Sequence, residues 1–458
     1  MESVICVVGV DWSDQKHSYA VRTASGQEEE EEGEFGSDPE AVHEWVRRLR
    51  PCYGQGKIVI ALEQSRGALM YALSAYDFID LVPINPRAAK AYRDSLHLSG
   101  AKDDPVDAAL IRDFVWNHRG QLRVWHGDDP ITRKLRLLVE GRRDLVDQRT
   151  ATSHALNAAL KQYFPHILEW FGDGGSALGR AFLGRWPTLE QARHARADAV
   201  RGLVRAHSRK SAAEIDMLLL KIRSAVPLTT DPAIIEPLAL RVVTLVAILD
   251  PIDEHLKQYE TAIAQVWQSD ADRELFESFP GAGPVMAPRL AVALGSDRSR
   301  FNDPSELQTY SGIAPVVERS GKQCWTHARW QCPKFLRQSF HEFAECSIPH
   351  CAWARAFYHQ QRERGAGHHE AIRALAFRWI RILYRCWKSN TLYQEERYLE
   401  SLKRRGSPLM MRLCGLTYDL RWLRAGGLAR QRIRRNCHYR PLSACACRDA
   451  GSRRLKKA

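Results

Sequence analysis

Three features that this sequence lacks exclude broad classes of protein. No apolar run approaches the roughly 18–20 residues that a helix needs to cross a bilayer, so no membrane partner is expected. The apolar start, MESVICVVGVDWSD, has no basic segment and no small-residue cleavage site, which favours a first β-strand over a signal peptide. No two cysteines have the Cys-x-x-Cys spacing of a typical small zinc site. The sequence therefore predicts neither a membrane-spanning chain nor a zinc module.

The cysteines that are present are more consistent with free thiols than with disulfides. There are 11 of them, an odd number, scattered from Cys6 to Cys447 in a large chain. Such a distribution fits a reducing cytoplasm better than a disulfide framework. Cys324, His327 and Cys332 could suggest zinc, but they do not have the spacing of a paired ligand set. We therefore expect a cytoplasmic protein with reduced thiols.

Positive charge is concentrated at one end of the chain. The formal net charge is +13, which on its own suggests a nucleic-acid partner. Residues 401–458, however, hold 16 of the 67 Lys and Arg but only 2 of the 54 Asp and Glu, so the rest of the chain is close to neutral. The body also contains an acidic run between Glu28 and Glu34. Nucleic-acid binding by the body must therefore be argued from local groups of residues.

Length and composition predict a globular protein with more than one domain. With 458 residues, 45% of them hydrophobic, the chain can bury two or three cores. Its first part alternates strand patterns, at 3–11, 17–24, 57–63 and 80–85, with a helical pattern at 41–49. We therefore expect an α/β domain with a mixed sheet over residues 1–115.

The middle of the chain, residues 116–272, is expected to be helical. Helical periodicity covers about 132–164, and again 234–270 with an interruption at Pro251. Two long amphipathic helices in one chain are typical of a helical hairpin or coiled coil. Several short helical patterns at about 168–232 suggest an insertion between them.

Residues 273–400 are expected to form a mainly helical C-terminal domain. Within them, the stretch SFPGAGPVMAPRL predicts a glycine-rich turn between two helices. Such a turn is either an ordinary connection or a place where backbone N–H groups approach a phosphate. Residues 401–458 have poor periodicity and many Arg, which indicates a basic and mostly disordered tail.

Four acidic residues in the first domain stand where a metal site could form. Asp11 ends the first predicted strand, Glu63 ends the central one, and Asp104 and Asp107 lie one turn apart at a predicted helix start. If they meet at one sheet edge, the four carboxylates repel each other unless a cation neutralises them. Oxygen ligands suit Mg²⁺ (or Mn²⁺), and two such ions can assist phosphodiester cleavage. The alternative is three surface acids and one capping residue.

Asp107 raises a separate question about its own helix. It shares a helix face with the apolar residues Ile111 and Phe114, at spacings of i, i+4 and i+7. Either this carboxylate only caps the helix, or it faces something cationic.

Basic and aromatic residues surround one serine of the C-terminal domain. Ser320 lies in VVERSGKQ, beside Gly321 and close to Arg319 and Lys322. Such a serine is usually a turn residue, and its sequence neighbours offer no base that could activate it. The following stretch interleaves basic with aromatic side chains, which fits phosphate pairing with base stacking or, equally, a helix with an aromatic core face. The basic members are Arg329, Lys334 and Arg337, and the aromatic ones are Trp325, Trp330 and Phe335.

Six stretches of the chain resemble, in the same order, insertion-sequence transposases of the DEDD type. This is the "one-ten" family with its "eleven-eleven" subgroup, known as bridge-RNA-guided recombinases. The stretches are VVGVDWSDQKHSYAV, ALEQSRG, INPRAAKAYRDS, AKDDPVDAALI, SFPGAGPVMAPRL and YSGIAPVVERSGK. Any one of them is weak evidence, whereas six in order are specific. Their neighbourhoods cover most of residues 4–115 and 272–390.

The resemblance implies an N-terminal domain with a RuvC-like, ribonuclease-H-like fold. The four acids of that family's active site would correspond to Asp11, Glu63, Asp104 and Asp107, and would hold Mg²⁺ or Mn²⁺. The implied fold class is α/β plus α: a mixed sheet, a central coiled-coil region and a mainly helical transposase domain.

One motif departs from the family's usual form. The family has Lys-Thr-Asp-x-x-Asp-Ala, whereas residues 102–108 of this chain read KDDPVDA. Asp103 therefore replaces a small polar residue and competes with Asp104 as the ligand, although the spacing to Asp107 favours Asp104. Lys102 of the same motif is expected to contact nucleic acid.

The resemblance also implies a covalent mechanism. Ser320, which follows a Gly-x-x-Pro segment at 312–315, would be the nucleophile, and Arg319 and Lys322 would bind nucleic acid beside it. The expected activity is that of a DNA transposase/recombinase acting on element ends and target DNA, guided by a noncoding RNA. The helical middle would form a homo-oligomer, either a dimer or a tetramer. Two alternatives stay open: a RuvC-like junction nuclease that uses water, and a degenerate copy that only binds nucleic acid.

Overall fold

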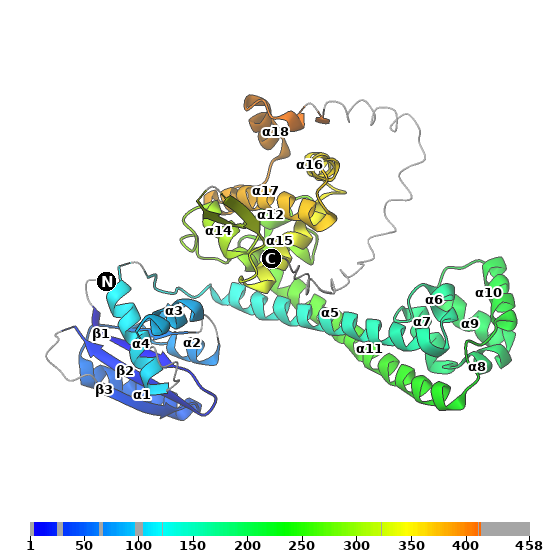
Figure 1. Ribbon diagram of the computed structural model, residues 1–458, viewed down its shortest axis with the longest axis horizontal. Coiled ribbons are helices and arrows are strands. Elements are labelled where there is room, and N and C mark those ends of the chain that lie inside the picture. Colours follow the sequence, from blue (N-terminus) through cyan, green and yellow to red (C-terminus); the bar gives the residue numbers. More distant parts are fainter. Residues whose placement is uncertain are drawn as a thin grey trace, which may run out of the picture. The chain divides into compact units, whose positions relative to one another are not determined.

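The computed structural model of the protein consists of two compact units, Met1–Asp128 and Asp129–Ala458 (Figure 1). It describes residues 4–24, 31–63, 67–96, 104–120, 122–321, 323–410 and 412–413. Lys102, Asp103, Lys322 and residues 414–458 lie outside this described part, and Asp104 is described by its backbone alone.

The first unit is built on a mixed sheet of five strands. The strands are β1 (Val4–Asp11), β2 (Lys16–Thr23), β3 (Glu31–Gly36), β4 (Lys57–Leu62) and β5 (Ile79–Pro83). Their order across the sheet is β3-β2-β1-β4-β5, with β1 antiparallel to β2 and parallel to β4. The α/β fold with a mixed sheet that the sequence predicts is therefore confirmed.

Helices cover both faces of this sheet. Side chains of α1 (Pro39–Tyr53) and α2 (Ala68–Leu73) pack on one face in a core that includes Trp45 and Met70. Side chains of α3 (Pro86–Leu96) and α4 (Asp104–His118) pack on the other face, around Ala89 and Ile111. The unit extends past α4, because the backbone N–H of Trp125 donates to the carbonyl of Leu81 in β5.

Strand β3 is the element of the sheet that the sequence pattern did not reveal. Its sequence, EEGEFG, reads as part of an acidic run, with Phe35 as its one large apolar residue. Phe35 is buried and stacks on Trp45 of α1 with ring centroids 4.1 Å apart, while Glu34 pairs with Lys16 of β2. Charged side chains on an edge strand discourage pairing with other chains, which suits the position of β3 at the edge of the sheet.

Gly9 allows α4 to lie unusually close to β1. A Cβ atom at this position would come within 2.2 Å of the carbonyl oxygen of Ala108 and 2.4 Å of the amide nitrogen of Arg112. No side chain fits in that space, so glycine is required for the helix to cross the strand here. The crossing brings the first turns of α4 down onto the sheet.

Two long helices form the frame of the second unit. Helices α5 (Pro130–Tyr163) and α11 (Pro232–Trp267) lie side by side (Figure 1). Arg142 pairs with Glu260 at 2.6 Å and Arg149 with Asp253 at 2.5 Å, so the two helices run antiparallel.

The expected interruption of the second long helix at Pro251 is wrong, because α11 continues through it. Proline removes one helical hydrogen bond and strains the preceding turn. The flanking turns are nevertheless held in place: Leu249 is fully buried, and Asp253 pairs with both Arg149 and Arg180. Packing on both sides of Pro251 therefore outweighs the tendency of proline to interrupt a helix.

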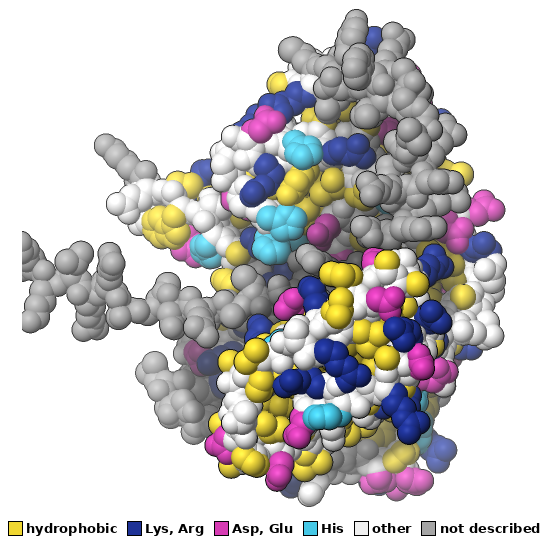
Figure 2. Space-filling view, turned by 90° about the vertical axis from the view of Figure 1, so that its right-hand side faces the viewer, with side chains coloured by type: hydrophobic (Ala, Val, Ile, Leu, Met, Phe, Trp, Pro, Cys, Tyr) yellow, Lys and Arg dark blue, Asp and Glu magenta, His cyan; other side chains and the backbone are white. Residues whose placement is uncertain are grey.

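Short helices close one end of this frame. They are α6 (His166–Phe171), α7 (Ala177–Arg185), α8 (Leu189–His194), α9 (Ala197–His207) and α10 (Ala212–Ser224). Their apolar side chains, such as Phe182, share a core with Leu160 of α5 and Val242 of α11. Figure 2 looks onto this end of the molecule and shows Lys and Arg side chains interspersed with hydrophobic and acidic ones.

The remaining elements pack around the other end of the long helices. They are α12 (Arg273–Glu277), α13 (Met286–Leu294), α14 (Pro304–Tyr310), β6 (Val316–Ser320), β7 (Gln323–His327), α15 (Lys334–Ser347), α16 (Ala352–Glu363), α17 (His368–Ser389) and α18 (Glu395–Arg404). Trp353, Trp379 and Trp387 are fully buried in their common core. This part of the chain is mainly helical, as expected.

The glycine-rich turn of this region is explained by packing. Gly281 has a φ of +83°, and a Cβ atom there would lie 2.5 Å from the carbonyl oxygen of Cys346 in α15. The turn therefore presses against another helix, which supports the interpretation as an ordinary connection between α12 and α13.

Helix α18 continues across the position where the basic tail was expected to begin. It ends at Arg404, and Leu402, Leu409 and Leu413 are buried against the core. The first residues of the expected tail thus belong to the folded unit. The rest of the tail, residues 414–458, lies outside the described part of the chain.

The surface of α11 is more apolar than the sequence analysis allowed. Within the described residues it is the one helix long and apolar enough to cross a membrane, with an 18-residue window of mean hydropathy 1.9. Only 22% of that window is buried. Leu240, Val243 and Ala247 are all exposed at spacings of i, i+3 and i+7, so α11 carries an apolar stripe that the described residues leave uncovered.

Candidate active site

Asp11 and Glu63 lie next to each other where the parallel strands β1 and β4 end. We call this end of the sheet the carboxylate edge. Asp11 is the last residue of β1, and Glu63 directly follows β4. The two strands are parallel, and Val10 stands opposite Leu62 in their register. The next position along each strand is therefore one of the two acids, and both stand where the parallel strands end.

The same two acids belong to the sheet face that α4 covers. Side chains alternate along a strand, so Asp11 shares a face with Val7, and Glu63 with Val59. Val7 and Val59 pack in the core that contains Ile111 of α4, on the opposite face from the core beneath α1. From this alternation we expect both carboxylates to lie on the side of the sheet that α4 covers.

Asp107 is buried in the first turn of α4, with 2% of the residue exposed. Its Oδ1 lies 2.7 Å from Nη2 of Arg93 in α3. The sequence analysis left open whether Asp107 faces a cation. In the structure it faces the guanidinium of Arg93. Arg93 was not among the expected site residues, and no spacing rule connects two residues in separate helices.

The donor set at this edge suits a hard divalent cation. All of its members are carboxylates, and oxygen ligands are those that Mg²⁺ and Mn²⁺ prefer. Within the described residues, no three His, Cys, Asp or Glu side chains are already grouped closely enough to hold a metal ion. The side chain of Asp104 lies outside the described part of the structure. The chemistry of the donors therefore fits the ion.

Ser320 lies at the end of a strand, where a turn residue was expected. It is the last residue of β6 and is paired with Gln323, the first residue of β7, across the turn of a hairpin. Gly321 has a φ of +57°, the conformation that such turns need at this position. Ser320 is exposed at the tip of the hairpin, accessible to a large substrate.

The histidine of the hairpin lies away from Ser320. His327 stands opposite Val316, at the far end of the hairpin, and lies 3.4 Å from Glu318. Glu318 also accepts a hydrogen bond of 2.8 Å from the indole N–H of Trp325. Glu318 therefore contacts both His327 and Trp325, and the sequence analysis did not predict this cluster.

The aromatic residues beyond Ser320 do not form one helical face. Trp325 is on β7 and Trp330 is in the segment before α15, and they are 44% and 74% exposed. Phe335 alone is on α15, with the guanidinium of Arg289 5.4 Å from its ring. The two tryptophans are therefore available for stacking, whereas Phe335 is partly buried and packs against the core.

The expected basic residues differ in accessibility. Arg319 and Lys334 are exposed, and Arg329 and Arg337 are half-buried. Burial, together with the charges of Arg373, His369 and Arg337, lowers the pKa of His341 to about 4. Burial is the main cause, and the nearby cationic groups of α15 and α17 add to it, so both favour the neutral imidazole.

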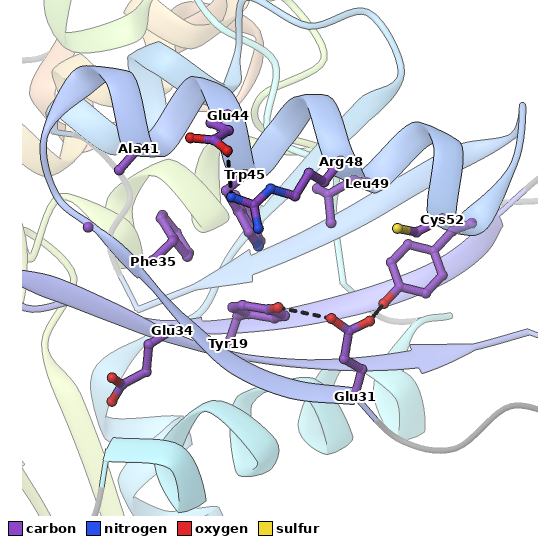
Figure 3. A pocket seen from close by; sticks show the side chains of 12 residues that line it. Tyr19, Glu31, Glu34, Phe35, Ala41, Glu44, Trp45, Arg48, Leu49 and Cys52 are labelled. Carbon is purple, nitrogen blue, oxygen red and sulfur yellow. Dashed lines mark hydrogen bonds and ion pairs between the residues drawn. The ribbon is translucent and has the colours of Figure 1, made fainter.

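A pocket between β3 and α1 lies away from the carboxylate edge. In Figure 3, Glu31 stands between Tyr19 and Tyr53 and accepts a hydrogen bond from each phenol. Burial and Glu31 raise the pKa of Tyr19 to about 12. The pocket is also lined by Glu34 and Glu44, so its acidic walls disfavour phosphate, and it belongs to the opposite face of the sheet from α4.

Two family models match this chain. A DEDD transposase model of the IS110 type matches residues 8–165, which include the carboxylate edge, and a model described as transposase of the IS116/IS110/IS902 family matches residues 273–359, which include the hairpin of Ser320. Together the matched segments cover more than half of the chain.

Curated relatives extend along most of the chain. It is 27% identical over 405 residues to the mini-circle protein for IS117 of Streptomyces coelicolor, covering 86% of this chain and 97% of the relative. It is 26% identical over 353 residues to the IS110 43.6 kDa protein of the same organism, covering 76% and 85%. It is 24% identical over 367 residues to the IS900 42 kDa protein of Mycobacterium paratuberculosis, covering 78% and 89%.

These matches fall on the segments that form the carboxylate edge and the serine hairpin, in the order in which the chain presents them. The chain belongs to the IS110 family of DEDD transposases.

Proposed function

We propose that this transposase is a recombinase in which a metal-binding carboxylate site assists a serine nucleophile. Asp11, Glu63, Asp104 and Asp107 would hold Mg²⁺ or Mn²⁺, and Ser320 would attack the DNA. The observation that carries the proposal is the shared register of Asp11 and Glu63 on the sheet face that α4 covers. A bound divalent ion would neutralise charge on the attacking and leaving oxygens of a phosphodiester.

The serine chemistry follows from the properties of a hydroxyl group. In the proposed step, Ser320 Oγ forms a bond to phosphorus while the bond from phosphorus to one flanking ribose oxygen breaks. The hydroxyl proton leaves to a base, and the released ribose oxygen takes up a proton. A serine needs such activation, and the histidine of its own hairpin, His327, stands at the far end. The reverse attack by a DNA hydroxyl then joins strands without an external energy source.

The exposed hairpin also supports nucleic-acid binding. Trp325 and Trp330 offer open aromatic faces, while Arg319 and Lys334 offer exposed cations in the same part of the sequence. Bases stack on such aromatic faces and phosphates pair with such cations. We infer that the DNA partners are element ends and target, and that a noncoding RNA selects the target, as the family resemblance implies.

The direct test of this function is a trapping experiment. Full-length protein is incubated with end-labelled element DNA and Mg²⁺ and then run on a denaturing gel. A serine mechanism produces DNA that stays attached to protein, and mass spectrometry places the phosphate on the peptide that contains Ser320. A nuclease that uses water produces free ends only, and a protein that merely binds nucleic acid produces no cleavage.

The choice between Asp103 and Asp104 can be settled by substitution. Asp104 begins α4, three residues before Asp107, whereas Asp103 precedes the helix. We expect Asp104→Ala to lose cleavage almost completely and Asp103→Ala to retain most of it. Single-turnover cleavage rates measured at saturating Mg²⁺ make the comparison. The reverse order of effects would make Asp103 the ligand.

The apolar stripe on α11 supports self-association. Leu240 is 69% exposed and Val243 is 38% exposed, and burying such side chains is worth about 1.5–3 kcal/mol each. We expect the double substitution Leu240→Glu and Val243→Glu to raise the dissociation constant of a homodimer or tetramer at least about tenfold. Light scattering coupled to size-exclusion chromatography measures the change.

The control for that experiment is Gln258→Glu, which adds a negative charge at an exposed polar position of the same helix. Its mass in solution should match that of the wild type. An unchanged mass in the double variant would show that the stripe is not the interface.

A further inference from the structure

Arg93 and Asp107 form a charged contact at one of the proposed metal ligands. Asp107 is almost completely buried, and its side chain is 2% exposed. The Arg93 side chain is 23% exposed, so it reaches the acid from a position that solvent can enter. A buried carboxylate is unfavourable without a compensating positive charge. Arg93 provides that charge at a separation of 2.7 Å.

Contacts between α3 and α4 hold Arg93 in place. The adjacent Tyr92 packs edge-on against Phe114 of α4, with ring centroids 5.4 Å apart, and its hydroxyl accepts a hydrogen bond of 3.1 Å from Asn117. These contacts fix the orientation of α3 against α4. The pair is therefore a consequence of how two helices dock and is not an accidental surface contact.

A guanidinium and a divalent ion compete for the same carboxylate. Arginine keeps its charge at every physiological pH and has no lone pair to offer a metal, so it can only repel a cation beside it. With Arg93 against Asp107, no described group of three acidic or other ligating side chains is arranged to hold a metal.

From these observations we propose that Arg93 is an internal counter-ion, which neutralises Asp107 in the metal-free protein and leaves it when a divalent cation binds. The inference rests on the proposed function, because it takes Asp107 to be a metal ligand. Arg93 is thus a positioning residue that sets the affinity of the site for its ion. The partial exposure of its side chain gives it room to withdraw toward solvent.

The test compares Mn²⁺ binding by full-length proteins without DNA. Titration followed by electron paramagnetic resonance counts free Mn²⁺ in wild type, Arg93→Gln, Asp107→Asn and Arg87→Gln. Arg87 is exposed on the same helix, so Arg87→Gln removes an equal charge without touching Asp107. We expect Arg93→Gln to bind Mn²⁺ about tenfold more tightly than wild type. Arg87→Gln should bind like wild type, and Asp107→Asn should bind more weakly.

Thermal unfolding gives a second and independent readout. Without metal, Arg93→Gln should melt several degrees below wild type, and saturating Mn²⁺ should remove most of that difference. If Arg93→Gln does not fold, Arg93→Lys is used. The lysine ammonium keeps the positive charge but lacks the planar, two-pronged geometry with which a guanidinium binds a carboxylate. It should bind Mn²⁺ a few-fold more tightly than wild type.

The outcomes separate this inference from the proposed function. Equal or weaker Mn²⁺ binding by a folded Arg93 variant, with clear binding by wild type, would overturn the role of Arg93 and leave the metal site standing. Absence of Mn²⁺ binding in every protein would refute the carboxylate metal site itself, and the inference would fail with it.

Discussion

Ser320→Ala should form no covalent complex with DNA while it still binds metal and nucleic acid. Alanine removes the oxygen that would bond to phosphorus and leaves the carboxylate edge unchanged. The exposed side chain at the tip of the hairpin makes no contribution to the core, so the melting temperature should stay close to that of wild type. A denaturing gel with end-labelled DNA and Mg²⁺ measures the adduct, which should fall below detection.

The matched control for this experiment is Thr326→Ala. Thr326 carries a hydroxyl on the same hairpin and is exposed, so it tests for a general effect of removing a hydroxyl there. Ser311 is a less suitable control, because it is fully buried and its hydroxyl donates to the carbonyl of Gln308, so its loss would disturb folding. Cleavage by Ser320→Ala at a rate near that of wild type, with free ends as the only product, would select a nuclease that uses water.

Asp11→Asn and Glu63→Gln should each abolish cleavage without unfolding the protein. Each substitution removes one negative ligand from the sheet edge, and loss of several kcal/mol of charge stabilisation slows a reaction by about a thousandfold or more. Stability should be unchanged or slightly higher in buffer without metal, because neighbouring carboxylates repel each other. Single-turnover cleavage rates and thermal melting with and without Mn²⁺ measure the two effects.

A matched control for these two variants is Asp80→Asn. Asp80 is on β5 of the same sheet, where it pairs with Lys57 at 3.2 Å. It lies outside the proposed metal site, so cleavage should remain near that of wild type. Strand exchange by Asp11→Asn at full rate would remove Asp11 from the metal site.

Local sequence patterns predicted most of the N-terminal fold, because its central strands are continuous apolar runs. β1 and β4 are buried on both faces and read directly as strands. The pattern failed for β3, whose glutamates form a strand only because β2 offers an antiparallel partner from Lys16 to Val21. It failed at Pro251 too, because packing against α5 keeps α11 continuous.

The residues of the candidate site, too, could be predicted from the sequence only in part. Asp11, Glu63, Asp107 and Ser320 could be named from the sequence, because residue type, strand ends and a family resemblance are all local properties of the chain. Arg93 could not be named, since its contact with Asp107 depends on the docking of α3 against α4. Likewise, only the hairpin register shows that Ser320 is paired with Gln323 while His327 stands at the far end.

The sequence by itself determined which chemical groups this protein has and in which local elements they lie. Covalent geometry and side-chain periodicity act over a few residues, so strands, helices and their ends follow from them. The tertiary structure decided which groups meet. Gly9 brings α4 onto β1, and the docking of α3 places an arginine against Asp107. Contacts between residues distant along the chain arise from packing and burial, which no local pattern encodes.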